Sequence, residues 1–149
     1  MSFEELDHTA DYLFRCRGRS PEELFSESAR AMFSIMFENN DADKGINADS
    51  GDACVTKEIE VESDSLSNLL IDFLSELLFV AEVDCLVLSG VKTKITGNTL
   101  KAEVTGEPFV LEKHGGGTEI KGISRSGVEI EKISEDDGVY YQAEIIFDV

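Results

Sequence analysis

The sequence is poor in basic residues, and this shortage argues against direct nucleic-acid binding as the main activity. Only 13 lysines and arginines stand against 31 aspartates and glutamates, which gives a formal net charge of −18. Proteins that bind nucleic acid directly present a basic surface to the phosphates, so direct RNA or DNA binding is not expected as the main activity. The same charge predicts fast, salt-sensitive encounter with a basic partner. It is equally consistent with solubility alone.

Cysteines and long apolar runs are also scarce. The three cysteines, Cys16, Cys54 and Cys85, are odd in number and widely spaced, and no two of them form a C-x-x-C pair. We therefore expect neither a disulfide framework nor a zinc site, but buried, reduced thiols in a cytoplasmic protein. The start of the chain lacks a basic segment followed by an apolar run, so no secretory signal is expected. The apolar stretch at residues 69–81 is too short and too polar to cross a membrane.

What remains is typical of a folded globular domain, with 149 residues, 42% of them hydrophobic. Two amphipathic helices are predicted. Ser20 and Pro21 suit a helix start, and apolar residues recur at three- and four-residue steps over residues 21–37. A second helix is expected from about Ser63 to Ala81. Its stripe of leucines favours core packing, with a partner-binding face as the alternative.

Strands are predicted where polar and apolar residues alternate or where short apolar runs lie between turns. They are expected at residues 12–17, 55–62, 85–88, 91–96, 100–106, 119–124, 128–133 and 140–147. This order of elements predicts an α+β fold, with a mixed, mostly antiparallel β-sheet and the two amphipathic helices packed on it. We expect one domain over residues 1–149, with a small inserted β lobe at about 84–118.

Residues 38–54 are polar, rich in aspartate and punctuated by glycine, which is typical of a loop. An EF-hand calcium loop is an alternative. Its spacing departs from that motif, however, because Gly45 comes one position early and Asp52 stands where the closing glutamate belongs. We assign this loop no role.

Chemically useful side chains concentrate at the two ends of the sequence. Asp11 lies just before the first predicted strand, and the last predicted strand is followed by Asp148 and Val149. Hard cations bind carboxylate and carbonyl oxygens. If the last strand lies beside the first, Asp11, Asp148 and the Val149 carboxylate form a divalent-cation site. The alternative is that Asp11 caps a turn and the C-terminal residues fray.

The segment Asp7-His8-Thr9-Ala10-Asp11 resembles the opening signature of the archease family. Further segments resemble that family in the same order and spacing: residues 22–25 and 29–33 in the first helix, residues 69–79 with an L-L-x-x-F-L-x-E-L-L pattern, Lys113-His114, residues 117–121, and the Asp148-Val149 ending. One segment departs. Residues 122–126 stand where family members often carry an Ala-Ile-Thr-Tyr-His-like stretch, so partner contacts made there are expected to differ.

The resemblance implies a protein cofactor rather than an enzyme. Archeases act with RtcB-type tRNA-splicing RNA ligases, which use GTP and manganese to guanylylate an active-site histidine before they join RNA ends. The archease promotes this guanylylation and allows multiple turnover. The resemblance also implies a divalent cation, calcium with manganese or magnesium as alternatives. The implied metal site comprises Asp11, Asp148 and Val149, and the implied partner contacts are His8, His114 and Lys121.

Two other functions are alternatives to that of a ligase cofactor. A metal-dependent hydrolase would use His8 as general base with Asp7 or Asp11 as ligand. The chain has only two histidines and no recognisable nucleophile arrangement, which counts against it. His8 can equally stabilise a turn through a hydrogen bond. The third possibility is a chaperone or interaction module that uses its acidic surface alone.

Overall fold

The structure, a computed structural model, describes residues 2–6, 12–37, 55–108, 119–125 and 128–149. The elements follow the chain in this order: β1 (Ser2–Leu6), β2 (Tyr12–Gly18), α1 (Pro21–Met36), β3 (Val55–Glu62), α2 (Leu66–Val83), β4 (Leu86–Thr96), β5 (Thr99–Pro108), β6 (Gly122–Ile123), β7 (Glu131–Glu135) and β8 (Gly138–Asp148).

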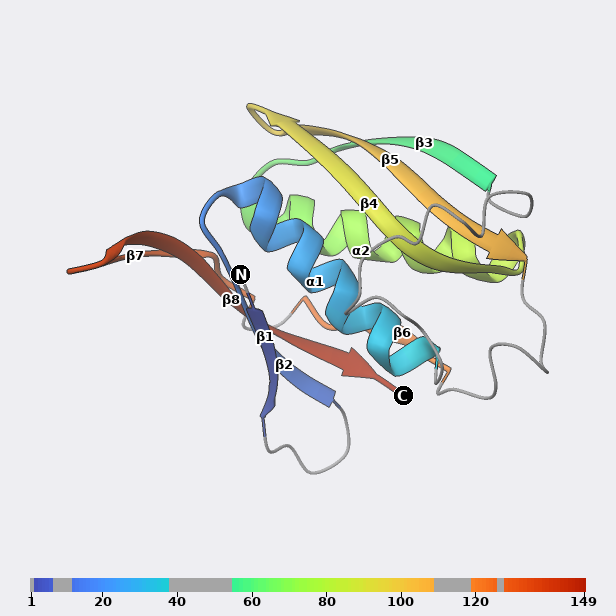
Figure 1. The fold of residues 1–149 in the computed structure, drawn as a ribbon, viewed down its shortest axis with the longest axis horizontal. Coiled ribbons are helices and arrows are strands. Elements are labelled where there is room, and N and C mark those ends of the chain that lie inside the picture. The colour runs from blue at the N-terminus through green and yellow to red at the C-terminus, as the bar shows by residue number, and fades with distance from the viewer. Residues whose placement is uncertain (1, 7–11, 38–54, 109–118, 126–127) are drawn as a thin grey trace.

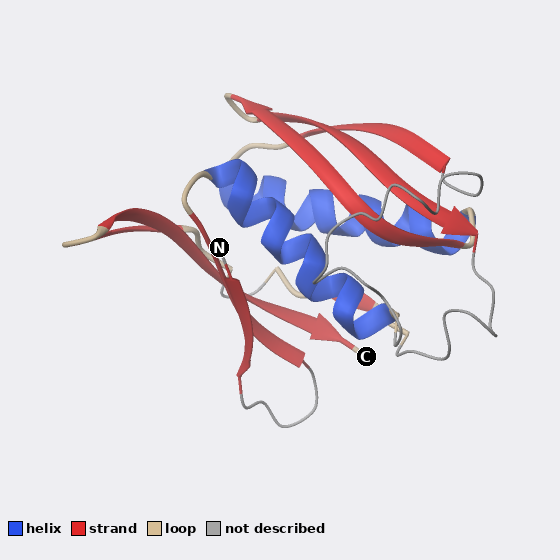
Figure 2. Ribbon diagram, viewed as in Figure 1, coloured by secondary structure: helices blue, strands red, loops and turns tan. Residues whose placement is uncertain are grey.

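The strands form two sheets with the two helices between them (Figures 1 and 2). One sheet has the order β1-β2-β8-β6, with β7 also paired to β8, and the other has the order β3-β5-β4. Every strand pair within the described ranges is antiparallel. The predicted α+β fold with mostly antiparallel strands is confirmed. The helices, which we expected on one sheet, are covered by two.

Helix α1 packs against both sheets, which explains its long run of buried residues. Its start is the predicted one, because the Ser20 hydroxyl accepts a hydrogen bond from the Glu23 N–H at 3.1 Å and Pro21 occupies the first helical position. Leu24 and Phe25 have no exposed surface, and the neighbouring turns are buried on several sides. A helix that is apolar on more than one side needs cover from more than one layer.

Helix α2 begins where the Ser65 hydroxyl accepts a hydrogen bond from the Asn68 N–H at 3.2 Å. The leucine stripe lies in the core, as predicted: Leu69, Leu70, Leu74 and Leu77 are completely buried. None of the helices in the described part of the chain combines the length and apolar character needed to cross a membrane.

Four strands differ from their predictions, and one of them is β7, which begins at Glu131, three residues later than expected. The two strands expected over residues 85–96 are one strand, β4, with a register shift between Leu88 and Gly90. The strand expected at 119–124 is reduced to the two residues of β6. Strand β1 was not predicted, because its five residues carry little apolar pattern. It forms through pairing with β2 and through the Phe3 ring, which lies 5.7 Å from the Phe14 ring.

We predict that Gly18→Ala destabilises the fold. A Cβ at position 18 would lie 2.7 Å from the Glu23 carbonyl carbon and closer still to the Leu24 nitrogen, both in the first turn of α1. Backbone cannot move aside as a side chain can, so we expect a loss of about 2 kcal/mol or more in urea unfolding. Gly122→Ala is the matched control, since its Cβ would meet no atom nearer than 3.9 Å. Equal stability of the two variants would contradict this packing.

The expected burial of the thiols is confirmed at Cys16 and wrong at Cys85, which is exposed. We predict that Cys16 resists thiol reagents in the folded protein, whereas Cys85 reacts. Burial raises the pKa of the Cys16 thiol from its ordinary 9.0 to about 12, so the nucleophilic thiolate does not form at pH 8. In a Cys54→Ser background, Ellman's reagent should titrate one thiol in the native state and two in guanidinium.

The raised pKa of Cys16 also predicts how the stability of the folded protein changes with pH. The Cys16 contribution to stability is complete below pH 9.0 and is lost as the pH rises towards 12, because the unfolded thiol ionises first. Rapid modification of native Cys16 at pH 8 would contradict both statements.

Candidate functional site

The predicted meeting of the two chain ends depends on strand β8, which pairs with β2 on one side and with β6 and β7 on the other. Tyr12 is the register partner of Phe147, and Gly122 is the partner of Asp148. The first residue of β2 and the last residues of β8 therefore lie at the same end of the sheet. Asp11, the residue directly before Tyr12, lies outside the described residues.

The inner face of β8 anchors this strand in the core. Alternate residues of β8, namely Ala143, Ile145 and Phe147, face the helices and are buried. The Phe147 ring meets the Phe14 ring of β2 edge-to-face, with 5.9 Å between centroids. The end of β8 is therefore held by packing, up to the residue before Asp148.

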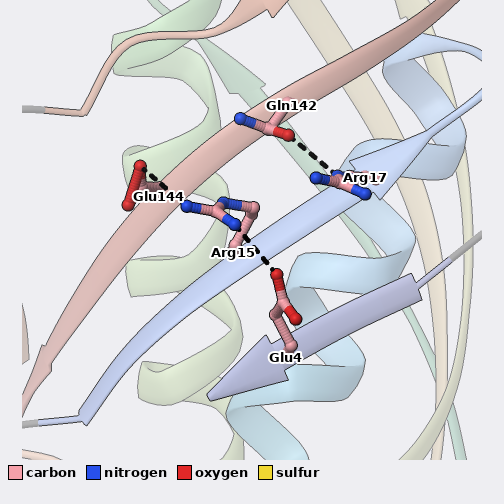
Figure 3. A network of polar contacts seen from close by, with 5 residues as sticks. All are labelled: Glu4, Arg15, Arg17, Gln142 and Glu144. Atoms are coloured by element: carbon pink, nitrogen blue, oxygen red, sulfur yellow. Dashed lines mark hydrogen bonds and ion pairs between the residues drawn. The ribbon is translucent and has the colours of Figure 1, made fainter. Parts of the chain in front are cut away.

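The outer face of β1, β2 and β8 carries a polar network (Figure 3). The Arg15 guanidinium lies 3.1 Å from the Glu4 carboxylate on β1 and 3.8 Å from the Glu144 carboxylate on β8. The Arg17 Nε donates a hydrogen bond to the Gln142 Oε1 at 2.8 Å. All of these side chains reach across from one strand to the next. Each exposed ion pair contributes little to stability on its own, so the network mainly fixes side-chain positions.

Asp148 continues the outward-facing alternation of Glu144 and presents an exposed carboxylate at the strand end. Its carbonyl oxygen accepts a hydrogen bond from the Lys121 N–H at 2.7 Å, so the backbone here is fixed. Gly122 lies beside the carboxylate, and even a Cβ at that position would stay 3.9 Å from the Asp148 Oδ2. The carboxylate is therefore open to a ligand or partner.

The oxygen atoms at the end of β8 are of the chemical type that binds hard cations. The Asp148 carboxylate and the Val149 main-chain oxygens are ligands of the kind that calcium, magnesium and manganese take. Within the residues that the structure describes, no three His, Cys, Asp or Glu side chains gather closely enough to hold a metal. A complete coordination sphere therefore requires further oxygens, for which Asp11 is the candidate beside Tyr12.

The remaining predicted site residues divide into two groups. Lys121 lies next to Asp148 through the backbone hydrogen bond, and it is exposed. His8 and His114 fall outside the described residues, so their predicted partner contacts stay predictions. The hydrolase alternative depends on His8 as well and is likewise untested.

Two contacts near the site were not predicted from the sequence. The Arg125 guanidinium, two residues beyond β6, pairs with the Asp72 carboxylate of α2. The Ser124 N–H also donates to the Ile146 carbonyl at 3.0 Å. These contacts fasten the segment that carries Lys121 to both α2 and β8. No local pattern predicts them, because Arg125 and Asp72 are 53 residues apart.

Comparison with known proteins gives a consistent result. The family model of the Archease protein family matches residues 3–149. Protein archease of Methanosarcina barkeri is 33% identical over 152 aligned residues, which cover 99% of this chain and 95% of that protein. A Drosophila melanogaster protein called archease-like is 35% identical over 153 aligned residues, covering 100% of this chain and 91% of that one.

Solved structures agree with the fold. The solution structure of Methanobacterium thermoautotrophicum protein 1598 matches with a TM-score of 0.67 at 27% identity, over 99% of this chain and 98% of the other. A Thermotoga maritima crystal structure, described as an archease and possible chaperone, has a TM-score of 0.58 at 22% identity, over 98% of this chain and 96% of the other, and supports the fold alone. From the family match over nearly the whole sequence and the curated relatives above 30% identity, this chain belongs to the archease family.

Proposed function

We propose that this protein is a cofactor that activates an RtcB-type RNA ligase in tRNA splicing, promoting guanylylation of the ligase and multiple turnover. A cation held by Asp11, Asp148 and the main-chain oxygens of Val149 would be the element presented to the ligase. The observation that carries the proposal is the register of β8, which puts Asp148 beside Lys121 and next to the strand that follows Asp11. The partner class is what the resemblance to archeases implies, and membership of this family supports an accessory role.

The geometry supports an edge that enters another protein's cleft. Asp148 is exposed at the end of a strand whose preceding residue is buried, so the carboxylate projects from a fixed base. Gly122 beside it adds no side chain that would block approach. A cation bound there would supply positive charge at the rim of the ligase's metal-containing cleft.

The charge of the chain supports the same partner. An RNA ligase needs a basic cleft for its substrate, and a protein of net charge −18 is attracted to such a surface at long range. The same charge keeps the protein from competing for RNA phosphates, which need basic side chains. The acidic surface and the exposed Asp148 carboxylate would therefore both contribute to binding the ligase.

We predict that Asp148→Asn removes most of the stimulation of multiple-turnover ligation by the cognate ligase, by about tenfold or more. The amide keeps the shape of the side chain and loses the charge that the cation needs. The matched control is Glu144→Gln, four residues earlier on the same outward face of β8. Wild-type stimulation by the Asp148 variant would remove the metal edge from the proposal.

We also predict that Asp11→Asn and Asp148→Asn each weaken Ca²⁺ or Mn²⁺ binding by about tenfold or more, because each removes one anionic ligand of a shared ion. Isothermal titration of the two ions measures this directly, with Glu144→Gln expected to bind as the wild type does. If only one of the two aspartates mattered, the chain ends would not share an ion.

A further inference from the structure

The solvent-facing side of α2 carries an unexpected pair of apolar side chains. Asp72, Glu76, Phe79 and Val83 follow one another at steps of four, three and four residues, so they lie on one stripe of the helix. This stripe faces away from the core, whose contacts are made by the leucines on the other sides. Phe79 is 59% exposed and Val83 is 61% exposed.

Core packing does not explain these two residues. The outer stripe of an amphipathic helix is normally polar, and the first half of this stripe obeys the rule with Asp72 and Glu76. In the second half, two large apolar residues four positions apart are neighbours on the surface. They are the most exposed large hydrophobic side chains in the described part of the chain. A contiguous apolar patch with a polar rim is typical of a protein contact.

The helix residues that flank this patch are acidic. Helix α2 contains no lysine or arginine, and Glu76 and Glu82 flank the patch. Asp84 caps the C-terminus of the helix, where the helix dipole favours cations rather than carboxylates. Among the described residues, the Lys57 ammonium pairs with the Asp84 carboxylate at 3.4 Å. Acidic groups at this end of a helix become favourable when a cationic surface covers them.

The patch is also connected to the candidate site. Asp72, at the other end of the stripe, pairs with Arg125, and Arg125 follows the strand whose Gly122 pairs with Asp148. The eleven residue-to-residue steps from Asp72 to Val83 span about 16 Å of helix. Contact with both the site and the patch therefore requires a partner surface that extends from the Asp148 carboxylate along this stripe to Phe79.

We infer that Phe79 and Val83 form a docking patch for a protein partner whose surface offers an apolar hollow ringed by lysine or arginine. The inference rests on the proposed function, in which this partner is the ligase. Phe79 is the anchor that the hollow receives, and the carboxylates at Glu76 and Glu82 meet the basic ring. A second copy of this chain is a poor occupant, because it would bring two acidic rims and two charges of −18 together.

The test is the binding of the double variant Phe79→Ser/Val83→Ser to the purified cognate ligase. We expect its affinity, measured by titration calorimetry, to fall by about tenfold or more. Its melting temperature should stay within about 2 °C of wild type, because neither side chain is buried. The matched control is Val139→Ser, which removes a 39%-exposed valine at the start of β8 and should bind normally.

The outcomes separate the two proposals. Binding of wild type with loss in the double variant supports the docking patch. Equal binding of both proteins overturns the patch and leaves the proposed function standing. No binding and no stimulation by wild type overturns both. If sedimentation shows that wild type self-associates through these residues while the double variant still binds the ligase normally, the patch is a contact between copies, which also overturns the inference.

Discussion

The antiparallel pairing of β8 with β2 is the constraint on which the rest of the structure depends. It joins the last strand of the chain to one of the first, and β8 in turn carries β6 and β7. Without this pairing, Asp148 would lie in a loose terminal segment, far in sequence from any residue of the opening block. With it, Phe147 lies opposite Tyr12, and the short β6 closes the other side of Asp148.

Backbone hydrogen bonds and buried aromatic contacts hold this pairing, and surface charges contribute little. The rings of Phe14 and Phe147 pack beneath the sheet, whereas the Arg15 and Glu144 side chains bridge the strands on the exposed face, where screening by water limits their value. This division lets a chain of net charge −18 fold stably, because its acidic residues lie mainly on surfaces that water and counter-ions reach. The same surfaces then remain available for a basic partner.

Much of the fold could be predicted from local patterns. Ser20 and Pro21 predict the start of α1, and the alternation of polar and apolar residues over residues 55–62 coincides with β3. Contacts between distant residues could not be predicted. The pair of Arg125 and Asp72 depends on the way α2 packs against β6, and the pattern of either segment alone contains no trace of it.

The candidate site shows the same division. The sequence predicts that Asp11 and Asp148 share an ion if the last strand lies beside the first. The two strands are neighbours, since Tyr12 is the register partner of Phe147, and the shared ion stays a prediction. Helical spacing puts Phe79 on the same stripe as Asp72 and Glu76, but its apolar side chain alone predicts burial, and only the structure shows that it is exposed. The direction of each turn of α2 decides which residues it leaves outside.

The most direct test of the central claim is a titration of the ¹⁵N-labelled protein with Mn²⁺, followed by the paramagnetic broadening of each amide signal. A shared ion at the paired chain ends predicts that the amides of Tyr12, Lys121, Gly122 and Asp148 broaden first and together, and that Asp148→Asn abolishes this selectivity. Broadening that spreads evenly over the acidic surface, or that affects only one of the two chain ends, would contradict it.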